Sequence, residues 1–259
     1  MTDALAAEWY KLRSVRSTWW VLAATALSFA FVMLLAFQTA HIWDGLPAER
    51  RAEFLLRPLQ EIGGWVAGLC LAVLGVLSIT SEYRTGMIRT TFAVLPRRRT
   101  VLAAKAAVVG TVALVAGEAM TVGSFLGTRL VIGDRPFPDQ RASIAHELPG
   151  FVISGTSVAM FALLGLSLGA LLRSTAGALV SVVLLWHVVP MLVLHLPEPW
   201  NGRLGSVVPS ALPRQAAGLG ADNSIYGDLL SPGAAAAVMA AYALAPLGLA
   251  ALALTRRDA

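Results

Sequence analysis

The chain has 259 residues, of which 57% are hydrophobic and 14% are charged, and its formal net charge is +5. Its mean hydropathy of +0.70 and its few charges exclude an ordinary water-soluble domain, in which about 25% of residues are charged. A helix needs roughly 20 apolar residues to cross a bilayer core about 30 Å thick, so this composition predicts several membrane spans.

Residues 1–17 predict an interfacial helix. Leu5, Trp9 and Leu12 recur at helical spacing, while Lys11 and Arg13 occupy other faces. Tryptophan and basic side chains favour the headgroup region of a bilayer. We therefore expect this helix to be anchored at the membrane surface. The expected headgroup anchors in this helix are Trp9, Lys11 and Arg13. The loop after the second span adds three more, Arg97, Arg98 and Arg99.

Six apolar runs of sufficient length follow. They predict an all-α polytopic membrane protein with one transmembrane domain over 1–259, whose spans are 18–37, 62–80, 101–126, 148–172, 176–196 and 232–254. Three pairs of glycines are spaced four residues apart, which allows close approach of helix backbones. These pairs are Gly64 with Gly68, Gly123 with Gly127, and Gly165 with Gly169.

The loop after the second span predicts a short helix over 81–95. Glu82 and Arg89 would lie two turns apart, and Pro96 would end the helix. We expect a helix held at the membrane face, with a surface available for contact. The alternative is a plain basic loop beside the membrane.

Two further connecting segments are too polar to span a membrane. The segment 38–61 predicts a short external helix. The segment 197–231 contains short apolar stretches at 207–212, 216–219 and 225–230, which predict short external or re-entrant helices before the last span.

The distribution of basic residues predicts the orientation. If the spans alternate, the two termini, the 81–100 loop and the 173–175 turn share one side, with eleven Lys and Arg residues against four acids, a net charge of +7. The opposite loops hold eight Arg against ten acids, a net charge of −2. Because Lys and Arg concentrate on the inner side, we expect both termini to be cytoplasmic. The basic pI then reflects topology and contact with anionic lipid, and no nucleic-acid partner is expected.

Three ionisable residues lie inside predicted spans, where charge is unfavourable. Lys105 is one turn into the third span, and we expect it to snorkel to the interface. Glu118 is deeper. It would line a substrate path, bond a hydroxyl such as that of Thr121 or Thr128, or sit protonated against a neighbouring helix. His187, in the fifth span, is either a packed neutral histidine or a second path residue.

Catalytic motifs are absent from the sequence. There is no Gly-x-x-x-x-Gly-Lys-Ser/Thr loop, so we expect no ATP hydrolysis by this chain. There is no His-Glu-x-x-His motif, and the four histidines lack ligand spacing, so no metal, cofactor or catalytic residue is expected. Ser157 with His187 is a conceivable serine-protease pair, but serine is common in spans as a packing residue. A stand-alone ion-coupled transporter or intramembrane enzyme remains the alternative function.

Four segments carry a resemblance to a known family. They are Glu-Trp-Tyr-Lys-Leu-Arg-Ser at 8–14 with Arg-Ser-Thr-Trp-Trp at 16–20, Glu-Tyr-Arg-Thr-Gly-Met-Ile-Arg-Thr at 82–90, Pro-Ser-Ala at 209–211, and Arg-Arg-Asp-Ala at 256–259. With these segments the chain resembles the permease subunits of type-2 ATP-binding-cassette (ABC) exporters, particularly the actinobacterial kind. It departs from many relatives at Met87, where they carry threonine.

The resemblance implies a function and partners. The helix after the second span would be a coupling helix that fits a separate ABC ATPase subunit, which binds ATP and Mg. The positions that would carry this role are Glu82, Tyr83, Arg84, Gly86, Arg89 and Thr90. A second permease copy, identical or related, would complete the path for a small amphipathic substrate, as in drug or natural-product efflux from the cell. The expected location is the cell membrane, and Glu118 and His187 are the candidate path residues.

Overall fold

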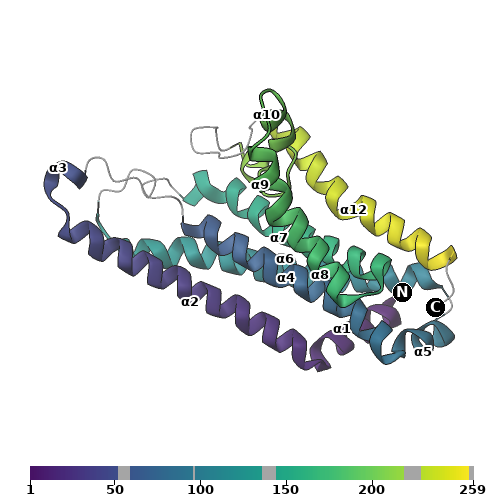
Figure 1. Ribbon diagram of the computed structural model, residues 1–259. Helices are drawn as coiled ribbons and strands as arrows, with labels where there is room; N and C mark the ends of the chain where they lie inside the picture. Colours follow the sequence, from purple (N-terminus) through teal and green to yellow (C-terminus); the bar gives the residue numbers. More distant parts are fainter. Residues whose placement is uncertain (52–58, 96, 136–143, 219–228, 257–259) are drawn as a thin grey trace.

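The computed structural model describes residues 1–51, 59–95, 97–135, 144–218 and 229–256, and the regular structure in these ranges is helical (Figure 1). Within them, six helical segments are long and apolar enough to cross a membrane, which confirms the predicted all-α polytopic fold. Their helices are α2 (Arg16–Gly45), α4 (Leu59–Thr85), α6 (Arg98–Ile132), α7 (Ile144–Leu172), α8 (Thr175–Val183) with its continuation, and α12 (Pro232–Arg256).

In the part of the chain that the structure describes, five shorter helices lie at the ends of the bundle: α1 (Thr2–Ser14), α3 (Ala48–Arg51), α5 (Met87–Val94), α10 (Trp200–Gly205) and α11 (Leu212–Ala216). The last two lie in the 197–231 segment. Helix α10 precedes the apolar stretch 207–212, and α11 joins the last residue of that stretch to the first residue of the stretch 216–219. Residues 207–211 form turns. Helix α11 then begins at Leu212, and Pro213 lies in its first turn, where a missing N–H group is tolerated. Most of the stretch 225–230 lies outside the described residues.

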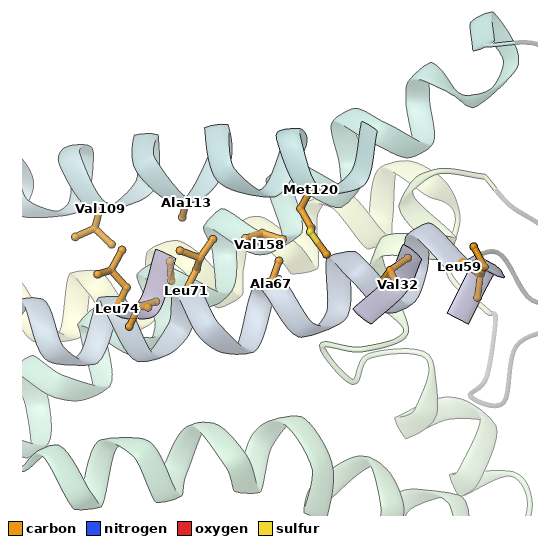
Figure 2. Close-up of a cluster of buried hydrophobic side chains, with 12 residues drawn as sticks. Val32, Leu59, Ala67, Leu71, Leu74, Val109, Ala113, Met120 and Val158 are labelled. Atoms are coloured by element: carbon orange, nitrogen blue, oxygen red, sulfur yellow. The ribbon is translucent and has the colours of Figure 1, made fainter. Parts of the chain in front are cut away.

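The centre of the bundle is formed by α4, α6 and α7. Helix α2 packs against α4 and α6, and both α8 and α12 pack against α7. Leu71 and Leu74 of α4 meet Val109 of α6 and Val158 of α7 in the buried core (Figure 2). Figure 2 also shows Ala67 and Ala113 between these larger side chains, where their small size lets the helices approach.

Glycines bring α4 and α7 into backbone contact. A Cβ atom at Gly75 would overlap the carbonyl oxygen of Ala162, and one at Gly165 would overlap that of Ala72. The close packing predicted for the pair at 165 and 169 is therefore confirmed. Since these glycines pack inside one chain, they give no reason to expect a second copy against them.

The fifth span is not one straight helix over 176–196. Helix α8 passes into a π-helical turn, η2 (Leu184–Val188), and continues as α9 (Val189–Leu194). Pro190 has no N–H group and its ring clashes with the carbonyl four residues earlier, so the helix widens, and the Val189 N–H group bonds to the Leu184 carbonyl oxygen.

One end of the bundle gathers α1, α5, the start of α8 and the end of α12, and we call it the α5 end (Figure 1). Arg98 Nη1 donates to the carbonyl oxygen of Leu254 at 2.9 Å, which links α6 to α12 there. The described residues at this end, 1–17, 81–95, 97–100, 173–175 and 254–256, include ten basic and three acidic side chains, a net charge of +7. The opposite end, which carries α3 and α10, is called the α10 end.

Candidate functional site at the α5 end

The break between α4 and α5 separates residues that were predicted to share one helix. Helix α4 continues through Glu82 to Thr85, and Gly86 then takes a φ of 72°, in the left-handed region that glycine adopts without steric penalty. The prediction of a single helix over 81–95 is wrong. Glu82 therefore belongs to a membrane helix, whereas Arg89 belongs to α5.

Glu82 points into the protein and is 1% exposed. Lys105 of α6 donates to Glu82 Oε1 at 2.8 Å and to the Ser78 carbonyl oxygen at 3.0 Å. It also donates to Glu8 of α1. Lys105 is itself 4% exposed, so the expectation that it snorkels to the interface is wrong. Two carboxylates hold its ammonium group inside the protein.

Helix α1 supplies the other half of this arrangement. Glu8 is buried and accepts a hydrogen bond from Lys11 Nζ at 2.6 Å. Lys11 also donates to Glu82 Oε1 at 3.1 Å and to Thr91 Oγ1 at 3.3 Å. The four charged side chains, which we call the charge cluster, are Glu8, Lys11, Glu82 and Lys105. Through it and Thr91, helices α1, α4, α5 and α6 meet at one point.

The charge cluster has no net charge, with two carboxylates and two ammonium groups. Burial lowers the pKa of Lys11, but the hydrogen bond to Glu8 and the charge of Glu82 outweigh it, so its pKa lies above the ordinary value. Glu82 Oε2 is buried without a hydrogen-bond partner among the described residues. Burial removes water from these charged groups, and this cost offsets much of the attraction between them. The cluster therefore fixes the relative positions of the helices more than it stabilises the fold.

A small, partly open pocket adjoins the cluster. Leu12 of α1, Leu77 of α4 and Val108 of α6 contribute apolar walls beside the charged groups. Helix α1 therefore leaves space beneath it, and ion pairs to Glu82 and Lys105 link it to α4 and α6.

Helix α5 is anchored on one side and exposed on the other. Ile88 is 4% exposed, Phe92 lies under the Arg98 guanidinium at 5.3 Å, and Thr91 binds Lys11. The outward side is basic and apolar. It consists of the exposed residues Arg84, Thr85, Gly86, Met87, Arg89, Thr90, Ala93 and Val94, which we call the α5 outer face.

The structure divides the six expected coupling residues into two groups. Arg84, Gly86, Arg89 and Thr90 lie on the α5 outer face. Glu82 is buried in the charge cluster. Tyr83 is half-buried under the Arg173 guanidinium, 5.4 Å from its ring centre.

The expected headgroup anchors also fall into two groups. Trp9, which is 50% exposed, lies at the surface of the α5 end with Arg13, Arg97 and Arg99. Lys11 and Arg98 bind protein groups instead, the first in the charge cluster and the second on α12.

The candidate path residues have different neighbours. Glu118 lies against Gly155 of α7, whereas the exposed His187 packs its ring 4.9 Å from that of Trp65 on α4. The structure does not pair Glu118 with either predicted hydroxyl group. Thr121 donates to the Gly117 carbonyl oxygen, and Thr128 Oγ1 has no partner among the described residues.

The serine-protease arrangement is not formed. Ser157 Oγ donates to the Ser154 carbonyl oxygen at 2.7 Å, and His187 packs against Trp65. Across the described ranges, no three His, Cys, Asp or Glu side chains gather in a group that would hold a metal ion.

Sequence reasoning missed Glu8 and the true position of Lys105. A signal for Glu8 was present, because it lies four residues from Ala4 and from Leu12, on the inward stripe of α1. Lys105 interrupts an apolar span, and a buried charge needs a partner of opposite sign.

A comparison of the sequence with protein-family models finds no match, and a comparison with curated proteins finds none either.

Proposed function

We propose that this chain is the permease subunit of an ATP-driven exporter of the type-2 ABC kind, coupled to a separate ATPase subunit that binds ATP and Mg. The observation that carries the proposal is the charge cluster, which ties α5 to α1 and to two central membrane helices. The motif at 82–90, one of the four segments that carry the sequence resemblance, contributes Glu82 to this cluster and most of the α5 outer face.

Helix α5 has the properties of a mechanical link. Its eight residues are too few for a stable isolated helix, so its contacts with the bundle must hold it in place. A partner bound to the outer face would push on a helix whose Thr91 is bonded to Lys11, and Lys11 in turn contacts Glu82 of α4. Since Lys105 of α6 bonds the same carboxylate, such a displacement would reach both α4 and α6.

The proposed orientation places the α5 end in the cytoplasm, where ATP is available. Its described segments carry the net charge of +7, and basic residues near span ends concentrate on the inner side of a membrane. Both chain termini are then cytoplasmic, and the α10 end faces outward. The proposed location is the cell membrane, with lipid headgroups around Trp9 and Arg13.

The proposed transport unit contains two permease copies, identical or related, and two ATPase subunits. A small amphipathic substrate would pass between the copies toward the outside. The chain itself supplies the path and the coupling surface, and the ATPase supplies the energy.

Affinity purification of the tagged full-length chain from its native membrane tests the proposal. We expect an ATP-binding subunit to be retained, and Arg89→Glu, on the α5 outer face, to reduce that retention at least tenfold. The matched control is Arg203→Glu, an exposed arginine of α10 at the opposite end, which should retain the subunit like the wild type.

The proposal fails if the wild-type chain retains no ATP-binding subunit, or if Arg89→Glu and Arg203→Glu retain it equally well. Transport by the purified chain alone, driven by an ion gradient without ATP, would establish the alternative of a stand-alone secondary transporter.

A further inference from the structure

Glu118 lies near the middle of the longest helix. In α6 the nearest other charged residues are Lys105, 13 residues before it, and Arg129, 11 residues after it. At about 1.5 Å per residue these lie roughly 20 Å and 16 Å away. Glu118 is therefore the single charged residue of α6 between them.

Its surroundings are open on the outward side. A Cβ atom at Gly155 would overlap the Glu118 carboxyl group, so this glycine provides the space in which the side chain lies. Helix α12 joins α6 at Leu102 and Ala106, three turns or more toward the α5 end. Glu118 is partly exposed.

Glu118 differs from the acids that are paired elsewhere in the structure. Glu8 and Glu82 bind lysines, and Glu61 accepts hydrogen bonds from Arg214 at 2.8 and 3.1 Å. Glu118 has no hydrogen bond or ion pair with any residue in the described ranges. An ionised carboxylate in apolar surroundings is unfavourable without a counter-charge, so this group is either protonated or paired with a cation, which would replace the proton.

Exposed apolar residues lie about one helical turn from Glu118 on α6 and from Gly155 on α7. Leu114 and Val115 of α6 are 38% and 64% exposed, and Val152 of α7 is 57% exposed. Such a surface suits the apolar body of an amphipathic molecule, while a single carboxylate selects the sign of its charge. The surface of α6 and α7 therefore offers an apolar area and one acidic group to such a molecule.

We propose that Glu118 is the recognition point for a lipophilic cation, whose charge pairs with the carboxylate and whose apolar body lies along α6 and α7. This inference rests on the proposed function, because it names the class of substrate for that exporter. Of the two candidate path residues, only Glu118 belongs to this site, because His187 lies against α4.

Binding of tetraphenylphosphonium to the purified full-length chain in lipid nanodiscs, measured by equilibrium dialysis at pH 7.5, tests the inference. We expect Glu118→Gln to weaken binding at least tenfold. Tetraphenylborate, of similar size and opposite charge, should bind Glu118→Gln at least as well as the wild type. The matched control is Glu61→Gln, an acid at the α10 end of α4, which should bind tetraphenylphosphonium like the wild type.

Gly155→Ala provides a second variant that keeps the charge. Its methyl group would displace the carboxyl group, which lies at the end of a flexible side chain, so the helices need not move. We expect it to weaken tetraphenylphosphonium binding several-fold. Equal binding by wild type, Glu118→Gln and Gly155→Ala would overturn the inference, as would an equal loss of both probes in Glu118→Gln.

The two proposals fail in different ways. Retention of the ATP-binding subunit is measured on the same variants, and Glu118→Gln should retain it fully because Glu118 is far from the α5 outer face. Full retention with unchanged tetraphenylphosphonium binding overturns the substrate class alone. Glu118-dependent binding by a chain that never retains an ATP-binding subunit overturns the exporter proposal alone.

Discussion

Lys105 of α6 donates a 2.8 Å hydrogen bond to Glu82 at the end of α4, and the same ammonium group binds Glu8 of α1. One buried cation therefore serves two carboxylates from different helices. Lys105→Met would leave the cluster with a net charge of −1. We expect a loss of about 3 kcal/mol or more, because an uncompensated buried charge is left behind. The measurement is the apparent Tm of the purified chain in detergent.

Two variants act as controls for that loss. Lys11→Met removes a charge whose side chain is 24% exposed, so water can partly replace it, and the Tm should fall less. Glu82→Gln with Lys105→Met restores neutrality and should be more stable than Lys105→Met alone. If the double variant lost the sum of both single losses, the two residues would not be energetically coupled.

Gly86 sets the direction of α5, and Gly86→Ala tests this role. No atom lies within 4 Å of a Cβ added there, so the change introduces only the strain of a φ of 72°. We expect a loss of about 1–2 kcal/mol and weaker retention of the ATP-binding subunit, because α5 reorients to relieve the strain. Thermal unfolding and co-purification measure the two effects.

Gly248→Ala is the matched control, since a Cβ at this position of α12 also meets open space but the backbone is helical. It should leave retention unchanged and raise stability by up to about 1 kcal/mol. Equal effects of the two glycine variants would mean that backbone conformation at Gly86 does not position α5.

The six spans followed from the sequence because span length is set by a local property, the run of apolar residues that a bilayer requires. The interruptions of the helices near Pro190 and at Gly86 were not predicted from the sequence. Pro190 was present in the sequence, but the periodicity of apolar residues continues through it, so the fifth span appeared straight. Gly86 was placed inside a helix because the residues on both sides favour helix.

The ion-pair partners of the buried charged residues were the hardest feature to predict from the sequence. Glu8 and Lys105 are 97 residues apart, and nothing local in the chain indicates that α1 lies beside α6. The sequence marks each residue as one that needs a counter-charge, but only the packing of the helices selects which one it meets. Glu118 is an exception, because it lies against Gly155 and meets no basic side chain among the described residues.

The contact between α4 and α7 gives a test of the central packing. In Gly75→Ala the new methyl group would overlap the Ala162 carbonyl oxygen, which is backbone and cannot rotate away. We expect a loss of about 2 kcal/mol from separation of the two helices. Gly110→Ala is the control, because its Cβ would lie 3.6 Å from Leu163 Cδ2, an ordinary contact. A Tm equally low for both variants would contradict this account.

At the α10 end, two neighbouring residues of α11 make interactions of different kinds. Gln215 is 3% exposed. Its Nε2 donates to the Ser206 carbonyl oxygen at 2.7 Å, and its Oε1 accepts from the Leu230 N–H at 3.0 Å. Arg214 forms an ion pair with Glu61 of α4 whose side chains are 25% and 36% exposed. The first interaction is buried and the second is screened by solvent.

Gln215→Ala should therefore destabilise the chain more than Arg214→Ala. Loss of Gln215 leaves buried backbone groups without partners, at a cost of about 2 kcal/mol, whereas an exposed ion pair contributes less than about 1 kcal/mol. Hydrogen exchange of peptides covering 206–218 should accelerate strongly in Gln215→Ala and slightly in Arg214→Ala. The reverse order would mean that the ion pair to α4, and not Gln215, holds this segment against the bundle.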